Sequence, residues 1–260
     1  MILRRFTKHV TDQNWFAVGL DIIVVVVGIF LGLQVTEWNE MRKERDKESG
    51  YLIRMAEDVK STLTNWETSE RIYGNIYKKG LVAMSFLNGD KPSIDNIQLL
   101  ATLYVSTQSH GGIYIIDDTY DELSSSGQLN LISNTVIRKD FRSLIEYIER
   151  GRSGNSIYND NISYRNAIRS IIPIEMQMQI RRECSGRKSY LPCEINLDPI
   201  LVKDSLQQIL ENPTIKLHLN IYMQSLVIEE TRVKRSIARI SELNERIQEE
   251  LLRYDVINEP

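Results

Sequence analysis

Hydrophobic positions divide the chain into one continuous apolar run and several helical stripes. Residues 17–35, AVGLDIIVVVVGIFLGLQV, are apolar except for Asp21 and Gln34. A helix of this length spans about 28 Å, which matches the hydrocarbon thickness of a bilayer. The run is apolar on every face, unlike the core helix of a soluble protein. The pattern therefore predicts a helix that crosses a membrane.

The flanks of the run indicate an anchor that is not cleaved. Trp15 and Trp38 lie at its two ends, and amphipathic aromatic side chains favour the membrane interface. A secretory signal has a shorter apolar core and a small-x-small cleavage site, which the exit VTEWNE lacks. We predict a cytoplasmic segment at 1–14, a transmembrane helix at 15–37 and an extracytoplasmic helical bundle at 38–260.

Basic residues flank the run on both sides, so their count does not set its orientation. The two cysteines, Cys184 and Cys193, lie close together in ECSGRKSYLPCE. Their spacing predicts a local disulfide, which persists outside the cytosol; the alternative is two unrelated reduced thiols. On the disulfide interpretation the protein crosses a bacterial inner membrane once, with its N-terminus in the cytoplasm and its bulk in the periplasm.

Beyond the run, apolar residues recur at steps of three and four. One helix is expected from about residue 14 to about residue 87, where NGDKPS ends it. A stripe from Leu219 to Tyr254 keeps close to a 3.5-residue period, typical of a coiled coil, in a last helix of about 40 residues. The predicted fold class is all-α: an N-terminal transmembrane helix that continues into an elongated antiparallel helical bundle or coiled coil.

Local signals place the shorter helices between these two. Ser93 is a candidate N-cap, Gly127 a candidate C-terminal stop, and Ser133 or Asn134 a candidate cap for the following helix. Asp198-Pro199 and Asn212-Pro213 mark two further helix starts, because proline favours the first helical turn.

Composition and motifs exclude several classes of function. The net charge is −3, so no basic field attracts nucleic acid. The three histidines, His9, His110 and His218, are dispersed and form no metal or protease motif. The sequence therefore predicts no catalytic residue, no metal and no cofactor, and any small-molecule ligand is unknown. A membrane-tethered hydrolase with an unrecognised site is an alternative.

The stretch VGLDIIVVVVGIFLGLQVTEWNEMRK ends in an exit of the form LQ-x-x-x-WNE-x-R. The stretch TYDELSSSGQLNLISN has the form TY-x-x-L-x-x-SG-x-L-x-L-I. The first resembles the N-terminal membrane helix, and the second resembles the other hallmark, of a bacterial family known as domain of unknown function 6090. The resemblance implies a single-pass, largely helical membrane protein and supplies no catalytic residues.

The membrane run contains candidate contacts with another membrane helix. Asp21 is an ionisable group inside an apolar segment, where such groups are costly and often functional. Gly28 and Gly32 form a GxxxG pattern, which allows close helix approach. The candidate contacts are Asp21, Gly28, Gly32 and Gln34. The alternative for Asp21 is an acid near the interface that headgroups or the N-terminal basic residues solvate.

The TYDELSSSG segment is the second candidate site. Polar side chains cluster there between helices, and we expect a recognition corner for a ligand or partner at the far end of the bundle. Its residues are Thr119, Tyr120, Glu122, Ser126, Gly127 and Asn130. The alternative is that these residues only cap and pack the bundle.

These observations predict a non-enzymatic, single-pass membrane protein that acts as a scaffold, accessory subunit or extracytoplasmic sensor. Its expected partners are the lipid bilayer and either a second copy or another membrane protein. The alternative is a subunit of an ion-coupled motor or transporter that uses Asp21.

Overall fold

The computed structural model describes residues 15–108, 114–153, 157–184 and 193–258, and these residues form helices and loops without a strand among them. The expected all-α class is confirmed. The helices are α2 (Trp15–Leu87), α3 (Asn96–Ser106), α4 (Asp118–Ser125), the 3₁₀ turn η1 (Leu129–Leu131), α5 (Thr135–Ser153), α6 (Ile157–Arg169), α7 (Ile174–Cys184), α8 (Pro199–Glu211) and α9 (Pro213–Asn258).

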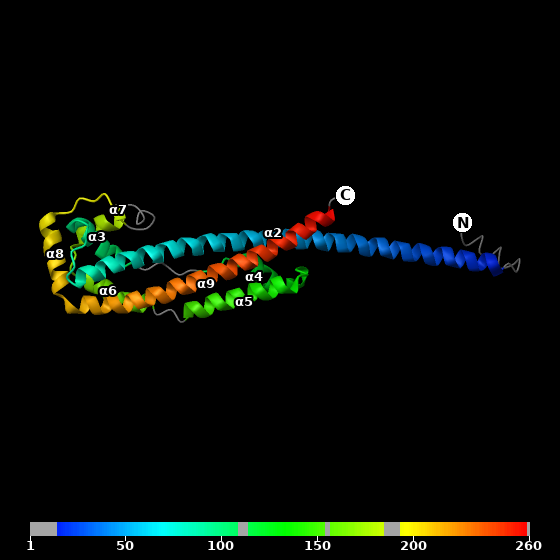
Figure 1. Cartoon of the computed structure of the whole chain (residues 1–260). Coiled ribbons are helices and arrows are strands. Elements are labelled where there is room, and N and C mark those ends of the chain that lie inside the picture. The colour runs from blue at the N-terminus through cyan, green and yellow to red at the C-terminus, as the bar shows by residue number, and fades with distance from the viewer. Residues whose placement is uncertain (1–14, 109–113, 154–156, 185–192, 259–260) are drawn as a thin grey trace.

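Two long helices form the framework. α2 has 73 residues and α9 has 46, and α9 returns antiparallel along α2 (Figure 1). The buried rows on both helices follow steps of three and four residues, with one seven-residue step near the end of each row, which matches the 3.5-residue period of a coiled coil. We call these rows the seam. On α2 it runs Glu48, Leu52, Met55, Val59, Thr62, Trp66, Ser69, Tyr73, Ile76 and Ala83; on α9 it runs Ile215, Leu219, Tyr222, Leu226, Glu229, Val233, Ser236, Ile240, Leu243, Ile247 and Tyr254.

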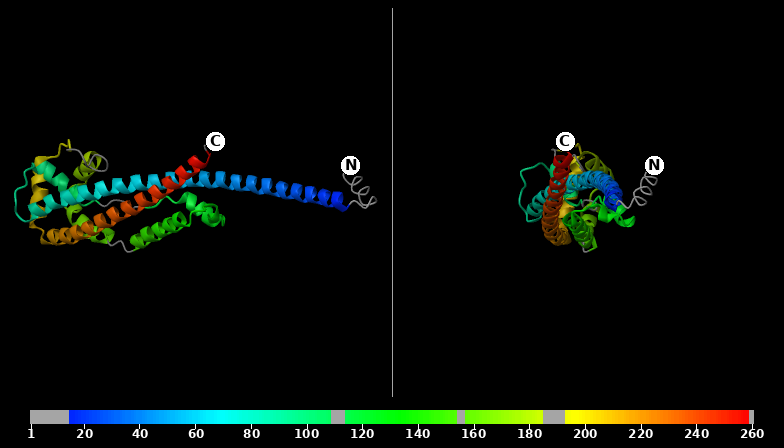
Figure 2. Two further views of the ribbon diagram at one scale, coloured as in Figure 1. Left: turned by 45° about the vertical axis from the view of Figure 1, so that its right-hand side comes forward. Right: turned by 90° about the vertical axis from the view of Figure 1, so that its right-hand side faces the viewer.

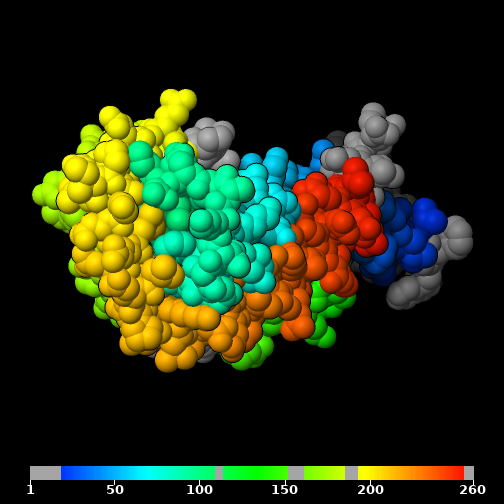
Figure 3. Space-filling model, turned by 60° about the vertical axis from the view of Figure 1, so that its left-hand side comes forward, coloured from blue at the N-terminus to red at the C-terminus, as the bar shows by residue number. Residues whose placement is uncertain are grey.

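The shorter helices pack around the two ends of this framework. α3, α7 and α8 gather at the end away from the N-terminus, where α8 lies beside α3 (Figure 3). α6 and α5 pack against α9, and α4 packs against α2. The result is an elongated bundle rather than a compact globule (Figures 1 and 2).

The predicted helix ends are confirmed, except that the N-cap of α3 lies two residues later than predicted. Asp198 caps α8 by accepting from the amides of Ile200 and Leu201, and Asn134 caps α5 by accepting from those of Val136 and Ile137. Gly127 ends α4 at φ +70°, a backbone conformation that glycine adopts without a side-chain clash. The cap of α3 is Asp95 rather than Ser93, because the carboxylate of Asp95 accepts from the amide of Gln98 at 2.8 Å.

α2 leaves the bundle as a single helix. Every residue from Ile22 to Lys47 is exposed, and Glu48 is the first buried residue of α2 among those whose side chains are described. The apolar part is long and apolar enough to span a membrane. We call residues 36–47, between the apolar run and the bundle, the stalk. The last turns of α9 cross α2 at the start of the bundle and then diverge from it (Figures 1 and 2).

Candidate functional site

The candidate membrane contacts lie on the lone part of α2. At 3.6 residues per turn, Asp21, Gly28 and Gly32 fall within about 40° of one another, so they share one face. Gln34 lies on a different face. A side chain at Gly28 or Gly32 would meet no other atom within 4 Å, so that face is open. The role of these residues as contacts with another membrane helix stays a prediction.

The expected interfacial aromatic residues occupy the two ends of the apolar run. The side chain of Trp15 lies outside the described residues. Trp38 is 58% exposed on the stalk, and the guanidinium of Arg42 lies 5.9 Å from the centre of its ring. An exposed indole next to a cation suits the headgroup region of a bilayer, where both groups find partners.

The expected recognition corner is not at the far end of the bundle. The chain returns from α3 along α2 towards the stalk, and three polar side chains on successive turns of α2 hold it there. Trp66 Nε1 donates to the carbonyl of Tyr114 at 3.2 Å, and Thr62 Oγ1 accepts from the amide of Ile116 at 2.9 Å. Asp58 Oδ2 accepts from the amide of Thr119 at 3.0 Å. These bonds place α4 and η1 at the end of the bundle nearest the stalk, which corrects the prediction.

Most of the corner residues make contacts within the chain. Glu122 pairs with Arg54, whose amino nitrogen lies 2.5 Å from Oε2, and accepts from the hydroxyl of Tyr51 at 3.2 Å. The hydrogen bond from Arg54 lowers the pKa of Glu122. The ring of Tyr120 stacks on Phe141, with centroids 4.9 Å apart.

The remaining polar corner residues cap and brace the backbone. Ser126 Oγ donates to the carbonyl of Glu122 at 2.7 Å, and Asn130 Oδ1 accepts from Arg138 at 2.8 Å. These contacts favour the capping and packing interpretation over a ligand site made of these six residues.

A buried carboxylate that sequence reasoning missed lies beside this corner. Glu48 is 5% exposed, and its Oε1 accepts from the backbone amide of Ser133 at 2.5 Å and from its hydroxyl at 2.7 Å. Burial, and next the hydrogen bond with Glu48, raises the pKa of Tyr254 to about 12. The sequence contained one signal for this burial. Glu48 lies four residues before Leu52, so it continues the spacing by three and four residues that Leu52 and Met55 show.

The same end of the bundle is closed by a second polar contact. Asn134 Nδ2 donates to Glu250 Oε2 at 2.6 Å, and Arg253 lies 3.2 Å from the same oxygen. Asn134 therefore caps α5 through its oxygen and binds α9 through its nitrogen. Together with Glu48 and Ser133, these residues join α2, α5 and α9 where the stalk begins.

A groove of about 460 Å³ opens next to these contacts. Its wall on α2 consists of Met41, Glu44, Arg45 and Glu48, and its opposite wall consists of Gln128, Asn130, Leu131 and Ser133. The groove therefore lies between the stalk and the loop that follows α4. It mixes apolar side chains with both signs of charge.

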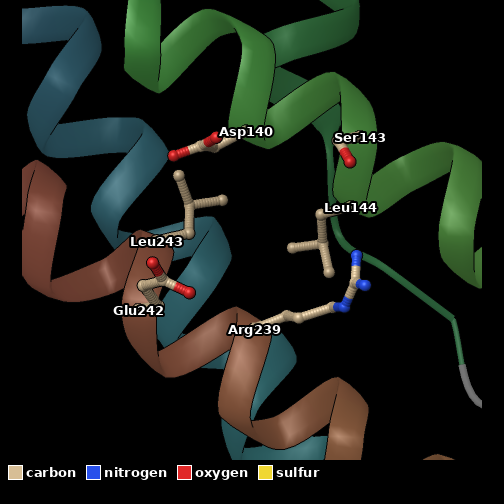
Figure 4. Close-up of a pocket in the computed structure, with 6 residues that line it drawn as sticks. All are labelled: Asp140, Ser143, Leu144, Arg239, Glu242 and Leu243. Atoms are coloured by element: carbon tan, nitrogen blue, oxygen red, sulfur yellow. The ribbon is translucent and has the colours of Figure 1, made fainter.

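A smaller groove of about 220 Å³ lies between α5 and α9 (Figure 4). Leu144 and Leu243 point into it, and its charged residues have partners. Arg246 bridges Asp140 at 3.0 Å and Glu242 at 2.7 Å, and Arg239 lies 4.2 Å from the centre of the Tyr147 ring. No unpartnered charge is left to hold a ligand, so this is a packing groove between two helices.

The cysteines are not joined by a disulfide. Cys184 and Cys193 are both buried free thiols, which corrects the predicted bond and removes its support for a periplasmic location. Burial, and next the neighbouring Cys193, raises the pKa of Cys184. The carbonyl of Cys193 accepts from Gln98 at 2.6 Å, so its position is set by α3. Both thiols are part of the hydrophobic core.

The far end of the bundle holds a buried polar network. Tyr164 and Ser106 share a hydrogen bond of 2.8 Å, and Tyr222 donates to the carbonyl of Gln108 at 2.6 Å. Burial raises the pKa of both phenols. Among the described residues no three His, Cys, Asp or Glu side chains gather as a metal site. The network fastens α3 to α6 and α9.

Comparison of the chain with protein-family models, with curated proteins and with solved structures found no match. The resemblance to domain of unknown function 6090 therefore stays a prediction that rests on the two stretches quoted above.

Proposed function

We propose that the protein is a non-enzymatic, single-pass membrane protein of the bacterial inner membrane, whose bundle acts in the periplasm as a scaffold, accessory subunit or sensor. The observation that carries this is the continuity of α2. One helix without a break contains the apolar run, the stalk and the first half of the seam. A movement of the membrane segment, or the binding of another membrane helix to it, is thereby transmitted directly to the bundle.

The contacts at the start of the bundle support this coupling. Glu48 binds Ser133, and Arg54 binds Glu122, so α2 is held by the segment between α4 and α5 where it emerges. A helix clamped at this point transmits rotation and translation as a rigid rod rather than pivoting freely. Such a device suits a protein that relays position or holds partners in place.

The alternative is an ion-coupled subunit, favoured by Asp21 alone. Its carboxylate lies within the apolar run, on the same open face as Gly28 and Gly32. The substitution Asp21→Asn separates the two functions. It removes the titratable group while it keeps a polar side chain of equal size, so it abolishes a proton pathway and leaves a scaffold intact.

The first experiment tests anchoring and orientation on the full chain. Membranes are extracted with alkaline carbonate, and the proposal expects the chain to stay in the pellet. In a Cys184→Ser, Cys193→Ser background, a cysteine at Lys43 is expected to react with a membrane-impermeant maleimide from the periplasmic side of intact cells. A cysteine at Lys8 is the matched control and should react only after lysis.

The second experiment tests the scaffold role. The protein is purified from its own membrane in mild detergent, and the composition and chain count of the complex are measured by native mass spectrometry. A stoichiometric complex, with itself or with a membrane protein, is expected. Extraction by carbonate, or a turnover activity that one polar substitution abolishes, contradicts the proposal.

A further inference from the structure

The seam of α2 does not stop where its partner helix leaves it. Counting back from Glu48 by the same steps of three and four, the next positions are Arg45, Met41 and Trp38. Met41 is 48% exposed and Trp38 58% exposed, because α9 has diverged from α2 at this level (Figures 1 and 2). The stalk therefore carries a coiled-coil row that continues an established interface and that no other described helix covers.

In the heptad notation abcdefg, the row consists of Trp38 and Arg45 at a and Met41 and Glu48 at d. Beside the row, Glu37 and Glu44 occupy g, and Arg42 occupies e. In a parallel coiled coil, a side chain at a inserts into a hole formed by four residues of the facing helix, at d, g, a and the next d. The α2 wall of the 460 Å³ groove consists of Met41, Glu44, Arg45 and Glu48. That wall has the spacing of such a hole, and the groove in front of it separates it from Gln128, Asn130, Leu131 and Ser133 of the same chain.

We propose that two copies of this chain pair through their stalks as a parallel, two-stranded coiled coil, in which Arg45 of each copy fills the hole on the other. The proposal rests on the membrane anchoring proposed above. Anchored copies are parallel and stand at the same height, so equal positions of the two stalks face each other. The knob and the hole lie on one chain, which a two-fold symmetric contact requires.

Charge complementarity identifies the second copy as the occupant. An arginine that enters the hole meets the two carboxylates of Glu44 and Glu48, which offset the like charge of the Arg45 that forms part of the hole. In the same register Glu37 at g lies next to Arg42 at e of the other copy, and symmetry makes this pair twice. A polar or basic residue at a single a position specifies the register and the number of helices, at some cost in stability. The stalk thus matches itself in shape and in charge.

Cysteine crosslinking of the full chain in membranes tests the pairing. In the Cys184→Ser, Cys193→Ser background, single cysteines replace Trp38, Met41 or Arg45 on the row, and Asn39, Lys43 or Asp46 off the row. Copper-phenanthroline oxidises facing thiols to a disulfide, and the product is measured on a non-reducing gel. The row positions are expected to crosslink about fivefold more than the others, since only a and d side chains face each other. All six positions are exposed in one chain, so the bundle core is undisturbed.

Charge reversal tests the register. In the Met41→Cys chain, Arg42→Glu or Glu37→Arg alone is expected to lower the crosslinking yield several-fold, because two pairs become repulsive at once. The double variant is expected to restore the yield. Lys43→Glu makes the same change of charge off the row and should leave the yield unaltered.

The outcomes separate the two proposals. Carbonate extraction of the same variants reports on anchoring by itself, and a chain released by carbonate contradicts the proposed function. A chain that stays anchored but crosslinks equally on and off the row overturns the dimer. A product whose mass is not twice that of the chain also overturns it, because another protein then covers the stalk.

Discussion

Ser133 donates two hydrogen bonds to a single carboxylate oxygen of Glu48, one from its backbone amide at 2.5 Å and one from its hydroxyl at 2.7 Å. Glu48 is the first buried residue of α2, and Ser133 directly precedes the residue that caps α5. This contact decides where the lone helix ends and the bundle begins. It also fixes one corner of the groove that Arg45 of a second copy is proposed to enter.

Removal of the Glu48 carboxylate should weaken the bundle. Glu48→Ala leaves the amide and hydroxyl of Ser133 without their acceptor, so we expect the free energy of unfolding to fall by about 2–3 kcal/mol. Glu48→Gln keeps one acceptor oxygen and should cost less. Glu40→Ala, about two turns earlier and exposed, is the matched control and should change stability by less than about 0.5 kcal/mol.

Urea unfolding of the detergent-solubilised chain measures these differences. The fluorescence of Trp66, which is 2% exposed, reports the loss of the bundle. Equal effects of the substitutions at Glu48 and Glu40 would show that the contact with Ser133 does not hold the base of the bundle together.

Two glycines should respond to alanine in opposite directions. Gly127 has φ +70°, so Gly127→Ala forces a left-handed conformation and should destabilise the chain by about 1 kcal/mol. Gly74 lies inside α2, and an added Cβ meets no atom within 4 Å. Gly74→Ala should stabilise by about 0.5–1 kcal/mol, because glycine is a poor helix former. Thermal unfolding followed by circular dichroism distinguishes the signs, and a stabilising Gly127→Ala contradicts the turn after α4.

The thiol chemistry of the protein should be that of two buried, protonated cysteines. Burial raises the pKa of Cys184, which keeps its thiol protonated. Maleimides react with the thiolate and not with the protonated thiol. We expect little labelling of the folded chain at neutral pH and two labels per chain after denaturation without a reductant. Intact-mass measurement counts the labels. A count of zero after denaturation would show that Cys184 and Cys193 form a disulfide.

Stability should fall at alkaline pH. The folded pKa of Tyr254 is about 12 against an ordinary value of 10.0, and burial also raises the pKa of Tyr164, Tyr222 and Cys184. Above the ordinary values the unfolded chain loses protons that the folded chain retains. The contribution of these groups is therefore fully present below about pH 9 and is lost as the pH rises through their folded values.

Urea midpoints measured from pH 8 to pH 11 follow this loss. Tyr254→Phe removes one of the titrating groups and should flatten the decline. Tyr77 is a tyrosine whose ring is also packed against the core, and Tyr77→Phe is the comparison variant. A midpoint that does not change with pH over this range would contradict the burial of the phenols.

Much of this architecture follows from local patterns. The sequence predicted the length of α2, the starts of α8 and α9 at Pro199 and Pro213, and the stop at Gly127. These features were predictable because the helix period, proline and glycine act within a few residues. The seam was readable as well, since a 3.5-residue period requires a facing helix. The spacing even extends to Met41 and Trp38, beyond the region that the bundle covers.

Three features depended on the tertiary structure. The position of the recognition corner, the burial of Glu48 and the free state of Cys184 and Cys193 all arise from contacts between residues far apart in sequence. Periodicity predicts which face of a helix is buried but not the direction in which a loop returns. The direction of the loop after α3 depends on the hydrogen bonds of Asp58, Thr62 and Trp66 to the backbone of residues 114–119. These bonds give partners to backbone amide and carbonyl groups that would otherwise be buried without any.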